Sequence, residues 1–373
     1  MTIQRPLPII AFLVVVSSVV QPAVPAGQAA PLVENGLSAS TRAELVAAAG
    51  RGAAYLHAQQ KPDGSWEFHP GITGLAAAAL LRLPGVSRIE ELRTTGRALD
   101  RLATLARPDG GIHDNDLETY VTAIAVMALQ AGGRPQDLPL IQKGRAYLVQ
   151  QVVDEGEGLK ESDPFYGSMG YRPTTKKDAA RGDVINLEYG LRALKETDLQ
   201  ADDPAWEKAI AFLQRLQNRS ASNDQPWAGN DGGFVYQPGL SKVEGGLTTS
   251  YGSATLAGVL SFSYANLKKG DPRVDAALRW IRDRYTVDEN PGMGQKTVYY
   301  YYMVLAKALA AVGEPTLTDN QGRSHAWREE LSRKLISLQH QEGFWVNPVT
   351  DEWQDNKVLV TSFVLSTIEA ILR

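Results

Sequence analysis

The stretch QKPDGSW at residues 60–66 recurs as QHQEGFW at residues 339–345, near the other end of the chain. Both copies follow the pattern Q-x-x-[DE]-G-x-W. Glycine permits a sharp turn, glutamine can hydrogen-bond the open carbonyls of a helix end, and tryptophan can pack over the turn. Shorter copies lie at residues 108–112 (PDGGI) and 230–234 (NDGGF). The motif therefore predicts a repeated connection between helices and is by itself no evidence of catalysis.

Two kinds of helical segment alternate around these turns. An amphipathic segment precedes each turn, and a segment rich in small and apolar residues follows it. Successive turn glycines are 46, 122, 60 and 51 residues apart, at Gly64, Gly110, Gly232, Gly292 and Gly343. The interval of 122 residues holds two units, with the missing turn expected near residues 167–170. The apolar segments are expected at residues 73–83, 118–130, 184–195, 248–265, 297–311 and 358–372.

This period is typical of stacked units that bury their faces on their neighbours. Alternating runs of β-branched residues are nearly absent, so few strands are expected. A helix that is apolar all round must be buried on all sides, whereas an amphipathic helix can cover it. Six helical hairpins in residues 31–373 can thus close into one ring, with the apolar helices inside. An open solenoid is the alternative. A closed ring would place the segment 358–372 beside the segment 73–83.

The turn motif resembles the QW repeat of squalene and oxidosqualene cyclases, whose relatives include the β-subunits of protein prenyltransferases. The resemblance implies an all-α (α/α)6 toroid whose central cavity accepts isoprenoid chains. Aromatic side chains at the starts of the inner helices would line that cavity, where ring faces can stabilise carbocations. The substrate-binding candidates are Tyr120, Tyr189, Tyr251, Tyr299 and Tyr300.

Squalene–hopene type cyclases donate a proton from the middle Asp of a D-x-D-D-T-A motif. The best match here is ETYVTA at residues 118–123, where Glu118 takes the first acidic place and Tyr120 replaces the proton donor. A phenol is a far weaker acid than a carboxylic acid. Ordinary polyene cyclisation is therefore not expected, and a cyclase would need a non-standard acid such as Asp116, Glu118 or Asp183.

The chain contains no cysteine, which excludes disulfides, thiolate zinc sites and a cysteine nucleophile. The zinc site of the prenyltransferases uses Asp, Cys and His, and Lys296 stands where the family's His would fall. No metal or other cofactor is expected. The formal net charge of -4 argues against nucleic acid as a partner.

Residues 1–30 have the features of a signal peptide: a short basic start at Arg5, an apolar run at residues 9–20 and small residues at 26–30. Export to the periplasm or the medium is therefore expected, with an uncleaved N-terminal anchor as the alternative. A membrane surface remains open as a partner, and the oligomeric state is not indicated.

Three functions stay open at this point. The chain could act on an isoprenoid-like ligand, as a terpene cyclase-like enzyme. It could be a noncatalytic module that binds a lipid, a glycan or a protein in the same cavity. It could be a carbohydrate-active enzyme, which would need two carboxyl groups facing each other across the cavity. The cavity wall distinguishes them, because an aromatic wall with few carboxyls favours isoprenoids and one with many carboxyls favours sugars.

Overall fold

The computed structural model describes residues 32–33, 36–85, 87–173 and 182–373, and Leu32–Arg373 forms one compact unit. The expected signal peptide at residues 1–30 lies outside the described residues. Among the helices that are described, none is both long and apolar enough to cross a membrane.

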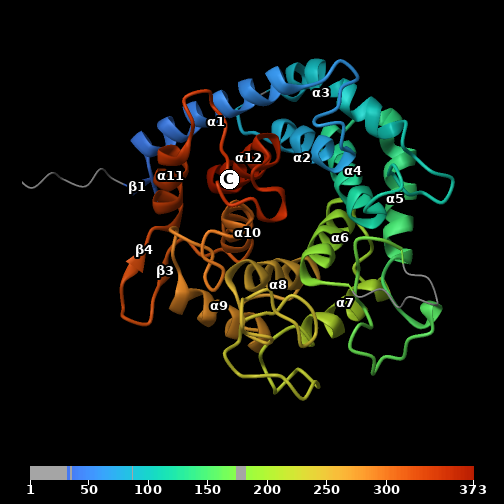
Figure 1. Cartoon of the computed structure of the whole chain (residues 1–373), viewed down its shortest axis with the longest axis vertical. Coiled ribbons are helices and arrows are strands. Elements are labelled where there is room, and N and C mark those ends of the chain that lie inside the picture. Colours follow the sequence, from blue (N-terminus) through green and yellow to red (C-terminus); the bar gives the residue numbers. More distant parts are fainter. Residues whose placement is uncertain (1–31, 34–35, 86, 174–181) are drawn as a thin grey trace, which may run out of the picture. The chain divides into compact units, whose positions relative to one another are not determined.

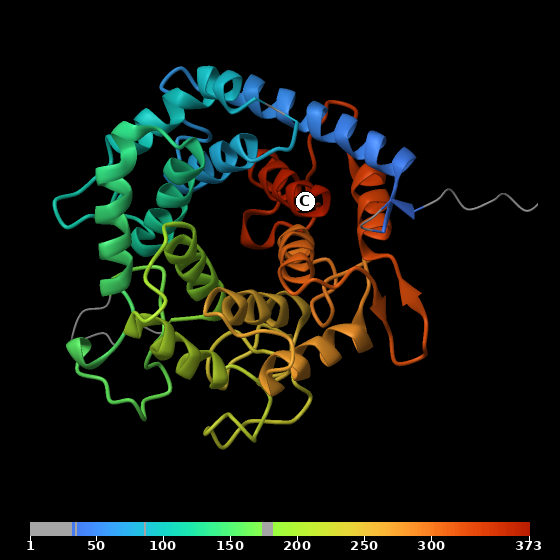
Figure 2. The same ribbon diagram turned by 180° about the vertical axis from the view of Figure 1, so that it is seen from behind.

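Six inner helices form a closed ring, which Figure 1 shows face-on and Figure 2 shows from behind. Each packs against the next along the chain, and the last packs against the first, so the ring prediction is confirmed and the open solenoid is excluded. These helices are buried almost all round, as their small and apolar residues predict. They are α2 (Pro70–Leu81), α4 (Glu118–Gly132), α6 (Val184–Glu196), α8 (Gly252–Tyr264), α10 (Val298–Ala311) and α12 (Lys357–Leu372).

Six outer helices surround this ring, each preceding its inner partner in the chain (Figure 1). Only one stripe of each is buried, as an amphipathic sequence requires. They are α1 (Ala39–Gln59), α3 (Arg88–Ala103), α5 (Leu138–Gln150), α7 (Pro204–Gln214), α9 (Pro272–Arg284) and α11 (Trp327–Leu338).

Strands are few in the described part of the chain, as expected. Strand β1 (Leu32–Val33) pairs antiparallel with β2 (Leu37–Ser38), and β3 (Leu317–Thr318) pairs antiparallel with β4 (Ser324–His325). The described residues also include three short 3-10 segments, η1 (Pro135–Asp137), η2 (Glu155–Glu157) and η3 (Asp351–Trp353), of which η3 departs from helical dihedral angles at Glu352.

The motif at residues 339–345 joins the last outer helix to the first. The Gln339 side-chain amide donates to the carbonyl of Gly343 (2.8 Å) and to that of Ala48 in α1 (2.9 Å). The Trp345 indole N–H donates to the Leu335 carbonyl in α11 (2.8 Å), and its ring is fully buried. The motif thus fastens α11, the turn and α1 together where the ring closes.

The motif at residues 60–66 makes the same contacts between α1 and α3. The Gln60 amide donates to the carbonyls of Gly64 (3.0 Å) and Thr94 (3.2 Å), and the Trp66 indole donates to the Leu56 carbonyl (2.7 Å). Both copies therefore act as structural fasteners, as the sequence predicts.

The missing third turn lies at Gly167, within the expected range. Gly343 (φ +94°) lets its turn approach α1 so closely that a Cβ atom would lie 2.6 Å from the Arg51 carbonyl oxygen. Gly167 (φ +85°) approaches the Lys208 carbonyl of α7 in the same way, and leaves no room there for a Cβ atom. Gly292 differs, because its nearest neighbour is the Tyr251 side chain in the inner layer. The fifth turn therefore closes on the inner ring and not on the next outer helix.

Candidate functional site: an aromatic cavity

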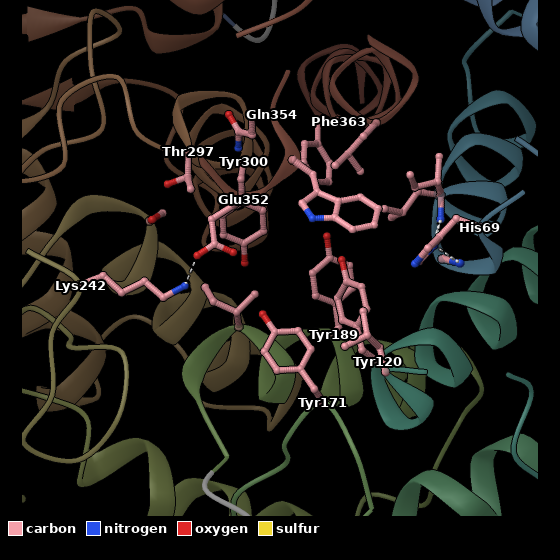
Figure 3. A pocket seen from close by; sticks show the side chains of 18 of the residues that line it. His69, Tyr120, Tyr171, Tyr189, Lys242, Thr297, Tyr300, Glu352, Gln354 and Phe363 are labelled. Carbon is pink, nitrogen blue, oxygen red and sulfur yellow. Dashed lines mark hydrogen bonds and ion pairs between the residues drawn. The ribbon is translucent and has the colours of Figure 1, made fainter. Parts of the chain in front are cut away.

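A pocket with about 1000 Å³ of open space, its mouth included, lies where the inner helices begin. We call it the aromatic cavity. Figure 3 shows its side chains converging from α2, α4, α6, α10, α12 and the loops before them. Its lining residues are His69, Gly71, Ile72, Leu75, Leu117, Tyr120, Tyr171, Ile185, Tyr189, Lys242, Tyr251, Ser253, Met293, Thr297, Tyr300, Glu352, Trp353, Gln354, Leu359 and Phe363.

Five rings form a continuous arc around the wall of this cavity. Tyr120 lies 5.7 Å from Tyr171 and 4.9 Å from Tyr189, between ring centroids. Tyr189 stacks at 6.5 Å on Tyr300, which meets Phe363 edge-on at 6.0 Å. These offset and edge-to-face geometries are the favourable ones for aromatic pairs. The aromatic arc is thus a preformed wall built from α4, α6, α10, α12 and, at Tyr171, the loop before α6.

The phenols of this wall stay neutral at ordinary pH. Burial raises the pKa of Tyr120, Tyr189 and Tyr300 above that of a free phenol. Tyr120, which takes the proton donor's place in the sequence, is therefore an even weaker acid than a phenol in water. Because the raised pKa keeps these phenols protonated, the wall is uncharged. It can therefore contact an apolar ligand without the cost of burying an anion.

An ion pair forms the polar side of the cavity. The Lys242 ammonium lies 2.6 Å from a carboxylate oxygen of Glu352 and also 4.3 Å from the centre of the Tyr236 ring. Both charged side chains are partly exposed, Glu352 about half so, which places the pair at the mouth. The Glu352 carboxylate accepts a hydrogen bond from Lys242. An acid catalyst would instead have to donate a proton, so this arrangement does not favour that role for Glu352.

The segment beside this ion pair has an unusual backbone. Glu352 and Trp353 both lie in the left-handed region, with φ of 56° and 62°. This conformation projects Trp353, 58% exposed, against the edge of the His69 ring at 5.4 Å. Strained residues of this kind are concentrated at ligand sites. This side of the mouth is therefore a candidate for ligand contact.

One ring nitrogen of His69, Nδ1, caps the start of α2, and the other, Nε2, is not used in that cap. Its Nδ1 accepts from the backbone N–H groups of Gly71 (3.1 Å) and Ile72 (3.3 Å), so the neutral ring carries its proton on Nε2. Burial lowers the pKa of His69, which favours that neutral form. His69 is therefore a fixed hydrogen-bond donor in the cavity lining and not a cation.

Four of the five tyrosines singled out from the sequence line the aromatic cavity: Tyr120, Tyr189, Tyr251 and Tyr300. Tyr299 does not, because its ring packs edge-on against Tyr302 at 5.7 Å.

None of the three carboxyls named as acid candidates lines the cavity. Asp116 is exposed and pairs with Arg172 at 2.6 Å, and Glu118 lies 3.9 Å from the same guanidinium. Asp183 is buried and caps α6, accepting from the backbone N–H groups of Ile185 (2.9 Å) and Asn186 (3.0 Å). Its carboxylate is thus occupied with the helix end.

A fourth acid, Glu188, was not found by sequence reasoning. It lies in α6 beside Tyr189, is 1% exposed, and has the Tyr264 hydroxyl 3.5 Å away. Burial raises the pKa of this carboxyl to about 7, against the opposing charges of Arg192 and Lys307. The signal available in the sequence was an acid in the middle of an inner helix, next to Tyr189.

No cluster of three or more His, Asp or Glu side chains suited to a metal occurs among the described residues. The sequence matches no protein-family model and no curated protein.

Solved structures with this fold include a protein from Actinoplanes, with a TM-score of 0.55 and 18% identity, covering 88% of this chain and 100% of that one. A variant of the type II terpene cyclase MstE from Scytonema, in complex with its substrate geranylgeranyl dihydroxybenzoate, gives a TM-score of 0.54 at 13% identity, covering 89% and 98%. Another variant holds the product merosterolic acid A, with a TM-score of 0.54 at 14% identity, covering 89% and 99%.

These identities show a shared fold and nothing finer. The chain is an all-α toroid like the terpene cyclase, and the resemblance to the QW-repeat family finds no support at the level of sequence. A glycosidase reaches a TM-score of 0.49 at 14% identity over 90% of this chain and 99% of its own, which is too low for an argument about this chain.

Proposed function

We propose that this protein binds a hydrophobic, isoprenoid-like chain in the aromatic cavity. The observation that carries the proposal is the aromatic arc, an uncharged wall of five rings along one side of the cavity. Sites for small molecules are mostly apolar clefts with a few placed polar groups. The terpene cyclase of the same fold binds a geranylgeranyl compound, which supports the class of ligand.

The polar groups of the cavity would fix the orientation of such a ligand. The Lys242–Glu352 pair lies at the mouth, and Gln354 and the Nε2–H of His69 are further hydrogen-bonding groups of the lining. A polar head group would therefore lie at the mouth, with the hydrocarbon chain against the arc. Trp353 would cover the chain at the side of His69.

The proposal is one of binding and not of cyclisation. Protonation of an alkene needs a strong acid in a dry site. Among the described residues that line the cavity, Glu352 is the one carboxyl, and Lys242 already donates to it. Tyr120 is weakened as an acid by burial. A glycosidase would need a second carboxyl across the cavity, so the carbohydrate alternative loses support on the same ground.

Removing one ring of the arc should weaken binding without unfolding the protein. We expect Tyr300→Ala, and separately Tyr189→Ala, to weaken the binding of geranylgeraniol by about 10- to 100-fold, because each loses the burial of one large side chain. Quenching of intrinsic fluorescence during titration of the full-length chain measures the affinity.

Phe262→Ala is the matched control. Its ring is equally buried in an inner helix, but it packs on Phe234 at 5.7 Å and does not line the cavity. This variant should lose stability and keep its affinity. Equal affinities of Tyr300→Ala, Tyr189→Ala and the parent protein would place the ligand elsewhere and refute the proposal.

A further inference from the structure

A second cavity, with about 1600 Å³ of open space when its mouth is included, lies at the other end of the inner ring. The C-terminal ends of α2, α4, α6, α8, α10 and α12 line it, whereas the aromatic cavity is lined by their starts. We call it the basic cavity, since among the described residues six cationic side chains line it and two carboxylate side chains do. The cations are Arg82, Arg88, Arg192, Lys307, Arg328 and Arg373, and the carboxylates are Glu196 and Glu369.

Each carboxylate is shared by two cations. Glu196 pairs with Arg82 (2.5 Å) and with Arg192 (2.8 Å). Glu369 in turn pairs with Lys307 (3.4 Å) and Arg373 (2.7 Å).

An excess of positive charge therefore remains inside the basic cavity. Burial and the charge of Arg192 lower the pKa of the Lys307 ammonium to about 8, even with Glu369 beside it.

Arg328 is a buried cation without an anionic partner. Its side chain lines the cavity at 8% exposure, and its Nε is buried without a hydrogen bond in the described structure. The guanidinium lies 4.3 Å from the Trp327 ring centre, and no carboxylate among the described residues pairs with it. Burying an unpaired charge is costly, and an anion in the cavity would remove that cost.

Helix ends alone do not account for these cations. The C-terminal end of a helix carries a partial negative charge that favours nearby cations. This explains Arg82, Arg192 and Lys307, which lie at the ends of inner helices. It does not explain Arg328 and Arg88, which come from the outer helices α11 and α3 and reach the cavity from its side.

We propose that the basic cavity binds an anionic group of the phosphate or diphosphate class, with Arg328 as its principal ligand. The planar guanidinium presents paired N–H donors that match the oxygens of a phosphate, and several such groups converge here. The site is independent of the aromatic cavity and of the function proposed for it. The phosphate can belong to a soluble compound or to a lipid head group.

Calorimetric titration of the full-length chain with inorganic diphosphate tests the proposal. We expect saturable binding, and we expect Arg328→Gln to weaken it by about tenfold or more, because a charged hydrogen-bonding partner is lost. Arg328→Lys keeps the positive charge but lacks the paired N–H donors of the guanidinium, and should give an intermediate affinity. Arg284→Gln is the matched control, since Arg284 also lies over a tryptophan of an outer helix (Trp280, 4.8 Å) but outside the cavity.

Sedimentation with vesicles of phosphatidylcholine, with and without phosphatidic acid, distinguishes the two sources of phosphate. Binding to phosphatidic acid vesicles that is lost in Arg328→Gln assigns the site to a lipid head group. Diphosphate binding with no such vesicle binding assigns it to a soluble compound. Equal binding by Arg328→Gln and Arg284→Gln, or no binding of diphosphate or of phosphatidic acid vesicles by the parent protein, would overturn the proposal.

Discussion

Replacing Trp345 by alanine is expected to lower the free energy of unfolding by about 3–5 kcal/mol, the usual cost of deleting a buried aromatic ring. The ring is fully buried, donates to the Leu335 carbonyl, and fills the space beside Gly52 of α1, where a Cβ atom would lie 2.7 Å from it. The substitution therefore opens a void where the ring of helices closes. Equilibrium unfolding in urea, followed by circular dichroism, measures the effect.

Substitutions of two other tryptophans test whether the loss of stability in Trp345→Ala comes from the role of the motif in joining neighbouring outer helices. Trp66→Ala removes the equivalent ring between α1 and α3 and should cost a similar amount. Trp353→Ala removes a ring that is 58% exposed and should change stability by less than about 1 kcal/mol. An unchanged unfolding midpoint in Trp345→Ala would contradict the structural role of the motif.

Glu188→Gln is expected to stabilise the protein by about 3 kcal/mol at pH 8 and to leave its stability at pH 4 nearly unchanged, at 1.36 kcal/mol per pKa unit. Burial raises the pKa of this carboxyl from 4.5 to about 7 in the folded state. Between these values the unfolded chain has lost the proton while the folded protein still binds it. Folding thus takes up a proton, so the stability of the parent protein falls as pH rises through this range.

Glutamine cannot ionise, so the variant should lack this dependence. Thermal or urea unfolding of both proteins between pH 4 and pH 8 measures the difference. Glu342→Gln, an exposed carboxyl in a turn, is the control and should behave as the parent protein does. A constant difference between Glu188→Gln and the parent over the whole range would show that Glu188 is not held protonated.

The architecture was predictable because its signals are local and repeated. A glycine at each turn and an apolar run after it recur along the chain, and each has a direct structural cause. Gly167 was expected from spacing alone and lies against α7 as the other fastened turns lie against their neighbours. Gly292 was counted with them, but the sequence did not indicate that its turn packs on Tyr251.

The cavity could be predicted only in part. The run of four tyrosines at residues 299–302 marked the start of α10, but successive residues of a helix point in different directions. Tyr300 faces the cavity, whereas Tyr301 and Tyr302 donate to the carbonyls of Thr286 and Val287. The rotation of the helix about its axis decides this, and it depends on packing against neighbours distant in sequence.

The polar side of the cavity could not be found from the sequence. Lys242 and Glu352 are 110 residues apart in the chain and meet only because the ring closes. Trp353 contacts His69 because Glu352 and Trp353 both have positive φ. Neither is a glycine, so nothing in the sequence indicated this backbone conformation. Asp183 was named because it precedes an inner helix, and that position serves the helix cap.

Native mass spectrometry of the full-length chain tests the central claim most directly. The protein is incubated with an equimolar mixture of geranylgeraniol, a saturated linear alcohol of the same carbon number and a malto-oligosaccharide. The account predicts one bound geranylgeraniol per chain, recovered unchanged on release, and its loss in the Tyr189→Ala and Tyr300→Ala variants. Preferential binding of the oligosaccharide, equal binding of the linear alcohol, or release of a cyclised product would contradict it.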